Sequence, residues 1–166
     1  MEIQDLIARF AMQPLPEGGW FSQGYISPEL LAREQLPERY REDKPFGTAI
    51  LYLISAENFS ALHRLPTDEI YHFYLGDPVE MLLIDTSGAA QRVTLGPDVL
   101  NGQQVQFVAP RGAWQGSRVQ PGGQFALLGT TMAPGFTPTD YEEARREELI
   151  SQFPHLEPEI RALTRI

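Results

Sequence analysis

Residues 62–76, LHRLPTDEIYHFYLG, hold the densest group of side chains that could do chemistry. Two of the three histidines in the chain, His63 and His72, stand here, and Glu69 lies between them. An imidazole can accept or donate a proton near neutral pH, and a nearby carboxylate can orient it or exchange a proton with it. Because a buried carboxylate is costly unless it is paired, Glu69 indicates a solvated cavity, a partner such as Arg64, or a protonated acid.

Amide and hydroxyl side chains elsewhere could line the same cavity. Gln106 and Gln115 each interrupt an apolar alternation, on strands that we expect to be adjacent. The residues that we expect to bind a ligand are His63, Glu69, His72, Gln106, Gln115, Tyr25, Thr48 and Tyr52, and the candidates for catalysis are His63, Glu69 and Tyr25. The alternatives are that His63 is a hydrogen-bonded core histidine and that Glu69 is exposed at a strand end. Strict alternation puts His72 on the opposite strand face from Glu69, and only a bulge would bring them together.

Short apolar runs with turn residues between them must position these side chains. We predict strands at 20–27, 47–55, 60–65, 69–75, 79–85, 90–95, 104–109, 113–119 and 123–132. Repeated strands at this spacing are typical of a β-sandwich or barrel. Helical spacing of apolar residues predicts helices at 2–12, 140–153 and 156–163, with Thr139 or Asp140 as N-cap, while 28–46 reads as a helical or irregular excursion.

Composition excludes several classes of protein. The length of 166 residues fits one domain, and the net charge of −9 repels nucleic acid and anionic lipid. The only basic residues that cluster in the sequence, Arg145 and Arg146, stand among glutamates. There is no cysteine, and no apolar run approaches the roughly 20 residues that span a bilayer. The first residues lack the positive region of a signal peptide, so we expect a cytoplasmic protein.

Two partial motifs resemble the cupin superfamily. His63 stands six residues before Glu69, and six residues separate Glu69 from Gly76, as in the first cupin motif. The run 110–115, PRGAWQ, follows the core of the second motif. Both motifs occur in order on strand-like sequence. The resemblance implies a mainly β fold, an RmlC-like cupin jelly-roll β-barrel with flanking N- and C-terminal helices.

The metal positions of that superfamily are only half retained. The second histidine of the first motif is Leu65 here, and the histidine of the second motif is Gln115. A neutral amide oxygen is a poor transition-metal ligand, so His63 and Glu69 remain as two weak metal candidates. We therefore predict no cofactor and disfavour a divalent metal.

A narrower resemblance, to the uncharacterised cupin-5 (DUF985) subfamily, extends over nearly the whole chain. It is carried by EGGWFSQGYIS, ALHRLPTDEIYHFYLGDP, VAPRGAWQGS and MAPGFTPTDYEEA. It implies a single domain over 1–166, with a barrel core at about 47–132 and C-terminal helices at about 139–165. It also implies a homodimer that shares a sheet or exchanges the N-terminal strand.

Three functions follow from these observations. The first is a cupin that binds a small polar or sugar-like molecule inside its barrel, with no assigned reaction. The second is a metal-independent isomerase or epimerase on a carbohydrate or nucleotide-sugar-like substrate, with His63 as base and Tyr25 or Tyr52 as acid. The third, a metal-dependent isomerase or dioxygenase, is disfavoured by the lost ligands. Whether the protein is an enzyme stays open at this point.

Overall fold

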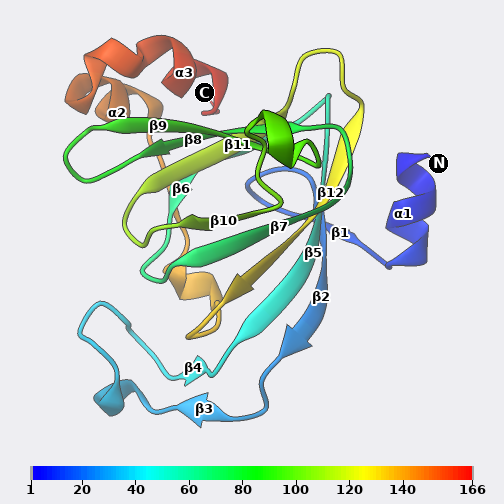
Figure 1. The fold of residues 1–166 in the computed structure, drawn as a ribbon. Coiled ribbons are helices and arrows are strands. Elements are labelled where there is room, and N and C mark those ends of the chain that lie inside the picture. Colours follow the sequence, from blue (N-terminus) through cyan, green and yellow to red (C-terminus); the bar gives the residue numbers. More distant parts are fainter. Residues whose placement is uncertain (1, 166) are drawn as a thin grey trace.

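Two antiparallel β-sheets face each other in the computed structural model, which describes residues 2–165 (Figure 1). The large sheet has the order β1 (Gln13–Pro14), β2 (Trp20–Ile26), β5 (Thr48–Ser55), β12 (Phe125–Met132), β7 (Glu69–Gly76) and β10 (Gln106–Ala109). The small sheet has the order β13 (Glu142–Glu143), β6 (Phe59–Arg64), β11 (Trp114–Val119), β8 (Val79–Ile84) and β9 (Ala90–Leu95). The jelly-roll fold expected from the sequence is confirmed, with the sheets as the two faces of a sandwich.

Alternating side chains fill the space between the sheets. Tyr52 and Ile54 of β5, Tyr71 of β7, and Met81 and Leu83 of β8 belong to one buried cluster. Because successive strand residues point to opposite faces, each strand also supplies an outward row. The outward rows are covered where helices pack on them.

The three α-helices cover parts of the outer faces. Helix α1 (Ile3–Arg9) packs Leu6 on Leu53 and Leu127 of the large sheet. Helices α2 (Arg146–Gln152) and α3 (Glu157–Ala162) lie over the small sheet, where Leu149 and Ile160 pack on Leu62, Leu82 and Ile84 (Figure 1). No helix within residues 2–165 is long and apolar enough to cross a membrane.

An arm formed by residues 27–46 leaves the sandwich and returns to it. It contains β3 (Leu30–Leu31), the 3₁₀ turn η1 (Arg33–Gln35) and β4 (Lys44–Pro45), and of the helical or irregular excursion expected at 28–46 it is the irregular alternative. Lys44, the only lysine of the chain, is fully buried and lies 2.5 Å from the carboxylate of Asp140. The pair ties the arm to the segment that follows β12.

The strands agree with the prediction to within two residues at each end, but the prediction after residue 139 is partly wrong. The helix predicted at 140–153 begins only at Arg146, because Glu142–Glu143 form β13 beside β6. The cap is also different. Thr137 and Asp140 cap the 3₁₀ turn η3 (Pro138–Asp140) reciprocally, and neither Thr139 nor Asp140 caps α2.

Candidate functional site

An interior cavity of about 470 Å³ lies between the sheets at one end of the sandwich. It is lined by Leu15, Pro16, Glu17, Phe21, Gln23, Ile26, Thr48, Ile50, His63, Leu65, Glu69, Thr130, Met132, Phe136, Pro138 and Tyr141. Most of these walls are apolar. The polar groups come from four places: the loop before β2, the large sheet, β6 with the start of β7, and the segment after β12. A volume of this size suits a small organic molecule.

His63 is buried, and its tautomer follows from its partners. Nδ1 lies 2.8 Å from the carbonyl oxygen of Ala61, and a carbonyl oxygen only accepts hydrogen bonds. Nδ1 therefore carries the proton, and Nε2 presents a lone pair. That lone pair lies 3.3 Å from Nε2 of Gln115, which donates to it. These two hydrogen bonds fix the imidazole in one orientation at the cavity wall.

Glu69 is held by two donors rather than by a cation. Its Oε2 accepts hydrogen bonds from Nε2 of Gln115 at 2.7 Å and from the hydroxyl of Tyr71 at 3.1 Å. The alternative partner expected from the sequence, Arg64, binds Glu142 instead. Burial raises the pKa of Tyr71 well above its usual value, and the charge of Glu69 adds to that shift. Tyr71 therefore stays protonated and remains a donor to Glu69.

Gln115 connects the two candidate residues. Turning its amide over would put Oε1 beside the carboxylate of Glu69, so the hydrogen-bond pattern fixes the amide orientation. Both amide hydrogens are used, one on Glu69 and one on His63. Its Oε1 and the hydroxyl of Ser117, two residues on along β11, are buried with no hydrogen-bond partner within residues 2–165. The sandwich interior thus holds two polar atoms without partners next to the hydrogen-bonded chain Tyr71–Glu69–Gln115–His63.

Glu17 is a cavity residue that the sequence did not indicate. It lies in the loop before β2, and its backbone carbonyl accepts a 2.8 Å hydrogen bond from the Ala61 amide of β6. Within residues 2–165 its carboxyl group has no hydrogen bond or ion pair with another side chain. Burial raises the pKa of this carboxyl, a hydrogen bond from its own backbone amide opposes the shift, and the charge of Glu69 adds to it. A turn residue between proline and glycine gives no sequence signal for such a role.

Tyr141 closes the cavity beside His63. Its ring stacks on the imidazole with a centroid separation of 5.2 Å and an interplanar angle of 29°. Burial raises the pKa of its hydroxyl, with a further contribution from Glu143. Tyr141 directly precedes β13. The pairing of β13 with β6, in place of the predicted helix, therefore also positions the Tyr141 ring. We expected neither.

Two expected hydroxyl residues face the interior. Thr48 lines the cavity, and its Oγ1 accepts a 2.9 Å hydrogen bond from the Phe136 amide. Tyr52 lies deeper, in the buried cluster between the sheets, and its hydroxyl donates to the Gly18 carbonyl at 3.1 Å. Burial raises the pKa of Tyr52, so its hydroxyl is poorly suited to release a proton. Its position argues against the acid role that we considered for it.

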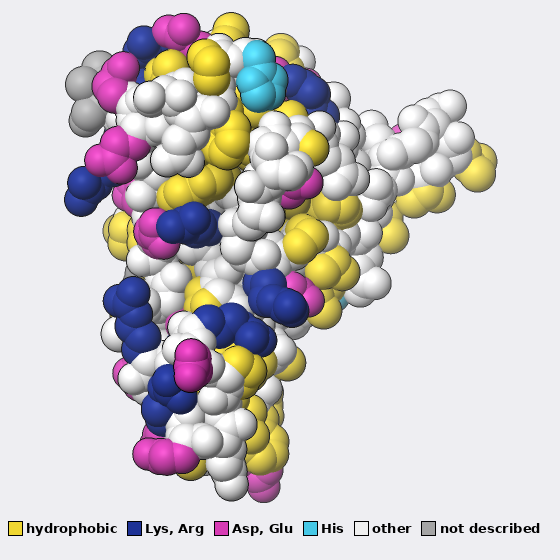
Figure 2. Space-filling model, turned by 90° about the vertical axis from the view of Figure 1, so that its left-hand side faces the viewer, with side chains coloured by type: hydrophobic (Ala, Val, Ile, Leu, Met, Phe, Trp, Pro, Cys, Tyr) yellow, Lys and Arg dark blue, Asp and Glu magenta, His cyan; other side chains and the backbone are white. Residues whose placement is uncertain are grey.

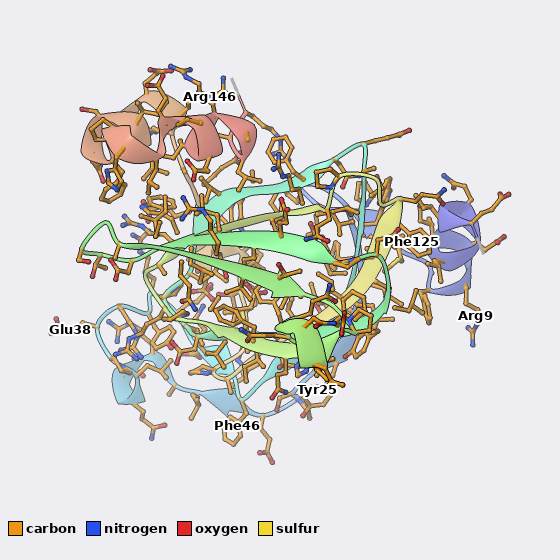
Figure 3. All side chains as sticks on the ribbon, turned by 45° about the horizontal axis from the view of Figure 1, so that its top comes forward. Arg9, Tyr25, Glu38, Phe46, Phe125 and Arg146 are labelled. Atoms are coloured by element: carbon orange, nitrogen blue, oxygen red, sulfur yellow. The ribbon has the colours of Figure 1, made fainter. Side chains whose placement is uncertain are left out.

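Three expected ligand residues lie outside this cavity, contrary to the expectation that all of them share it. The register of β2 shifts between Gln23 and Tyr25, which turns Tyr25 outward, where 54% of its surface is exposed. Figure 3 shows Tyr25 at the edge of the molecule. His72 forms hydrogen bonds with Thr131 and Gln106 on the outer face of the large sheet. Gln106 and Gln115 are on different sheets, because β10 pairs with β7 whereas β11 pairs with β6 and β8.

The cupin metal positions do not form a metal site in this chain. Among residues 2–165 no three His, Asp, Glu or Cys side chains are grouped so that they could hold an ion. Leu65 supplies an apolar wall, and the amide nitrogen of Gln115, a donor, faces both His63 and Glu69. A cation there would meet the N–H groups of Gln115 where the superfamily has an imidazole lone pair. The donor set therefore does not fit a transition metal.

Comparisons with known proteins agree with the fold. The sequence model of a family described as "Cupin superfamily (DUF985)" matches residues 4–144. A crystal structure of a Shewanella oneidensis protein is similar, with 26% identity, a TM-score of 0.89, and 99% of this chain and 98% of that chain covered. A hypothetical protein from Leishmania major shows 26% identity, a TM-score of 0.90 and full coverage of both chains.

More distant likeness is restricted to the fold. A dTDP sugar isomerase from Desulfovibrio desulfuricans is similar at 18% identity and a TM-score of 0.53, over 76% of this chain and 82% of that one. A search of the curated proteins gives no match.

Proposed function

The chain belongs to the DUF985 family of the cupin superfamily, and on that premise we propose that its interior cavity binds a small polar organic molecule. The observation that carries the proposal is the buried relay Tyr71–Glu69–Gln115–His63, of which Glu69 and His63 line a mostly apolar cavity. Buried polar groups are costly, and a fixed set of them at a cavity is how proteins orient a ligand.

A sugar-like ligand, with several hydroxyl groups on a compact carbon frame, matches this cavity best. Its hydroxyls can donate hydrogen bonds to the carboxyl oxygens of Glu17 and Glu69. Its C–H faces can pack on Leu65, Phe136 and the ring of Tyr141. An apolar ligand would leave the carboxyl group of Glu17 without a hydrogen-bond partner, so we place it second.

The geometry of His63 favours ligand binding over proton transfer. The Nε2 lone pair of His63 is already engaged by Gln115, so the imidazole cannot take a proton from a ligand until that amide moves. A metal-independent isomerase or epimerase is the second candidate function, and Glu17 is the observation that favours it. A carboxyl group with a raised pKa and no side-chain partner can take and return a proton at a higher pH than an ordinary glutamate can.

The test uses protein labelled with ¹⁵N in its histidines and a panel of aldoses, ketoses and polyols. The three histidines give three imidazole signals, of which only His63 lies at the cavity. We expect a ligand from the panel to shift the His63 signal while His155, exposed in the 3₁₀ turn η4 (Pro154–Leu156), stays unchanged. His63→Ala should abolish the binding, with His155→Ala as the matched control.

The second candidate is tested with the same panel. Exchange of solvent deuterium into the carbon next to a sugar carbonyl, lost in Glu17→Gln, would support proton transfer. Binding without any exchange in the wild type would leave the protein a binding module.

We also propose that two copies associate through the outer face of the large sheet. The part of this face that α1 leaves uncovered carries no Lys, Arg, Asp or Glu, although the whole chain carries 35 of them. Tyr25, Tyr74 and Val108 are each about half exposed there. A face without charges is complementary to a second copy of itself. Light scattering should give the dimer mass, which Val108→Glu converts to the monomer mass while Val99→Glu, on the 3₁₀ turn η2 (Val99–Asn101), does not.

A further inference from the structure

A second hollow, of about 370 Å³, lies at the rim of the sandwich next to the interior cavity. Its basic lining residues are Arg39 and Arg41 of the arm and Arg64 at the end of β6. The rest of the wall consists of Leu65, Pro66, Thr86, Gly112, Thr139, Asp140, Tyr141 and Glu142. The arginines are 23 residues or more apart between arm and strand, so the sequence does not show that they meet. Arg side chains gather in the lower half of the face that Figure 2 shows.

The positive charge of this arginine hollow is only partly neutralised. Its two carboxylates already have partners: Asp140 binds the buried Lys44, and Glu142 binds Arg64 through both of its oxygens. Within residues 2–165, Arg39 and Arg41 form no ion pair with a carboxylate. Two uncompensated guanidinium groups therefore face one hollow in a protein of net charge −9.

Two of the three arginines are held in place. Arg39 donates from Nε to the Pro66 carbonyl at 2.9 Å, and its guanidinium lies 4.7 Å from the centroid of the Tyr40 ring. Arg64 lies 4.6 Å from the Trp114 ring while it binds Glu142. Fixing a guanidinium before a ligand arrives reduces the entropy lost on binding. Anchored arginines distinguish this hollow from a flexible basic surface.

The arginine hollow and the interior cavity share two walls, Leu65 and Tyr141. Tyr141 also stacks on His63, and His63 and Arg64 are consecutive residues of β6 that face the cavity and the hollow respectively. We propose that the arginine hollow binds an oxyanion, a phosphate or a carboxylate, of the same molecule whose uncharged part occupies the interior cavity. This inference rests on the proposed function and narrows it to anionic, sugar-like ligands. Guanidinium groups bind both oxyanions through paired N–H donors.

Calorimetric titration with inorganic phosphate and, separately, with acetate tests the hollow alone. Arg41→Gln is the sharpest variant, because no hydrogen bond or ion pair of Arg41 exists within residues 2–165 and its loss should leave the fold intact. Arg145→Gln is the matched control, with the same loss of charge at an exposed helix start. We expect Arg41→Gln to raise the dissociation constant about tenfold, as for one lost charged hydrogen bond. The tighter of the two anions identifies the group.

Equal weakening by both variants would overturn the inference, because it would show general attraction to a charged surface. So would the absence of binding by either anion. The link to the cavity is tested with glucose and its phosphate monoester. We expect the ester to bind more tightly, with the advantage lost in Arg41→Gln and kept in Arg145→Gln. If instead His63→Ala abolishes binding of the parent sugar and the ester has no advantage, the proposed function stands and this inference fails. If the phosphate effects hold but His63→Ala changes nothing, the proposed function fails, and with it the shared ligand.

Discussion

Replacing Tyr71 by phenylalanine removes one of the two donors that stabilise the buried carboxylate of Glu69. The hydroxyl of Tyr71 lies 3.1 Å from Oε2 of Glu69, and this is its only hydrogen bond within residues 2–165. Tyr52 provides a matched control. Both tyrosines are 4% exposed and point into the sandwich, but the Tyr52 hydroxyl donates, also at 3.1 Å, to the neutral carbonyl of Gly18.

The two substitutions should differ because one acceptor is charged and the other is not. A hydrogen bond to a charged group contributes about 1.5–3 kcal/mol and a neutral one about 0.5–1.5 kcal/mol. Tyr71→Phe should therefore lower the free energy of unfolding by about 2 kcal/mol and Tyr52→Phe by about 1 kcal/mol. For a domain of this size these losses correspond to falls in Tm of roughly 4–8 °C and 2–4 °C.

Urea denaturation followed by tryptophan fluorescence measures both variants in one assay. The slope against urea should stay the same, since neither change alters the surface exposed on unfolding. Equal losses for the two variants, or a smaller loss for Tyr71→Phe, would refute the view that a charged Glu69 accepts a hydrogen bond from Tyr71.

Three further predictions concern other parts of the site. Because the folded-state pKa of Glu17 is raised, its protonated form contributes stability below its unfolded pKa of about 4.5, and that stability is lost as pH rises through the higher folded pKa. The free energy of unfolding of Glu17→Gln, measured in urea, should then equal that of the wild type at about pH 4 and exceed it at about pH 7. A difference that stays constant with pH would contradict a raised pKa for Glu17. Lys44→Met leaves Asp140 buried without its cation and should cost about 3–5 kcal/mol of unfolding free energy, most of which Asp140→Leu added to it restores; an undiminished loss in the double variant would show that the pair is not the cause. Leu65→His combined with Gln115→His supplies the two missing cupin ligands beside His63 and Glu69, and elemental analysis should find stoichiometric metal in this variant; none would mean that the four positions do not converge.

Periodicity in the sequence predicted most of the fold, because every second residue of a half-buried strand faces the core and is apolar. The runs at 79–85 and 90–95 match β8 and β9 to within one residue. The prediction of a helix at 140–145 was wrong, because the charged residues there are compatible with a helix and only pairing with β6 makes Glu142–Glu143 a strand. Local sequence carries no trace of that partner.

The site was predicted only where it depends on which face of a strand each residue occupies. His63 and Glu69 face the cavity as expected, and Gln115 reaches both from β11. Tyr25 was misplaced because the register shift at Gly24 reverses the faces of β2, and no pattern in the sequence marks that shift. Glu17 and Tyr141 reach the cavity from loops, whose paths depend on contacts with β6. Tertiary contacts of this kind cannot be derived from spacing.

The ¹⁵N spectrum of the three imidazoles, recorded with and without the panel of sugars and sugar phosphates, tests the central claim most directly. The structure predicts that His63 carries its proton on Nδ1 and keeps Nε2 as an acceptor for Gln115. A ligand in the interior cavity should shift the His63 signals while those of His155 stay in place. A proton on Nε2 of the free protein would contradict the relay. A His63 signal that no member of the panel moves would contradict a polar, sugar-like ligand in the cavity.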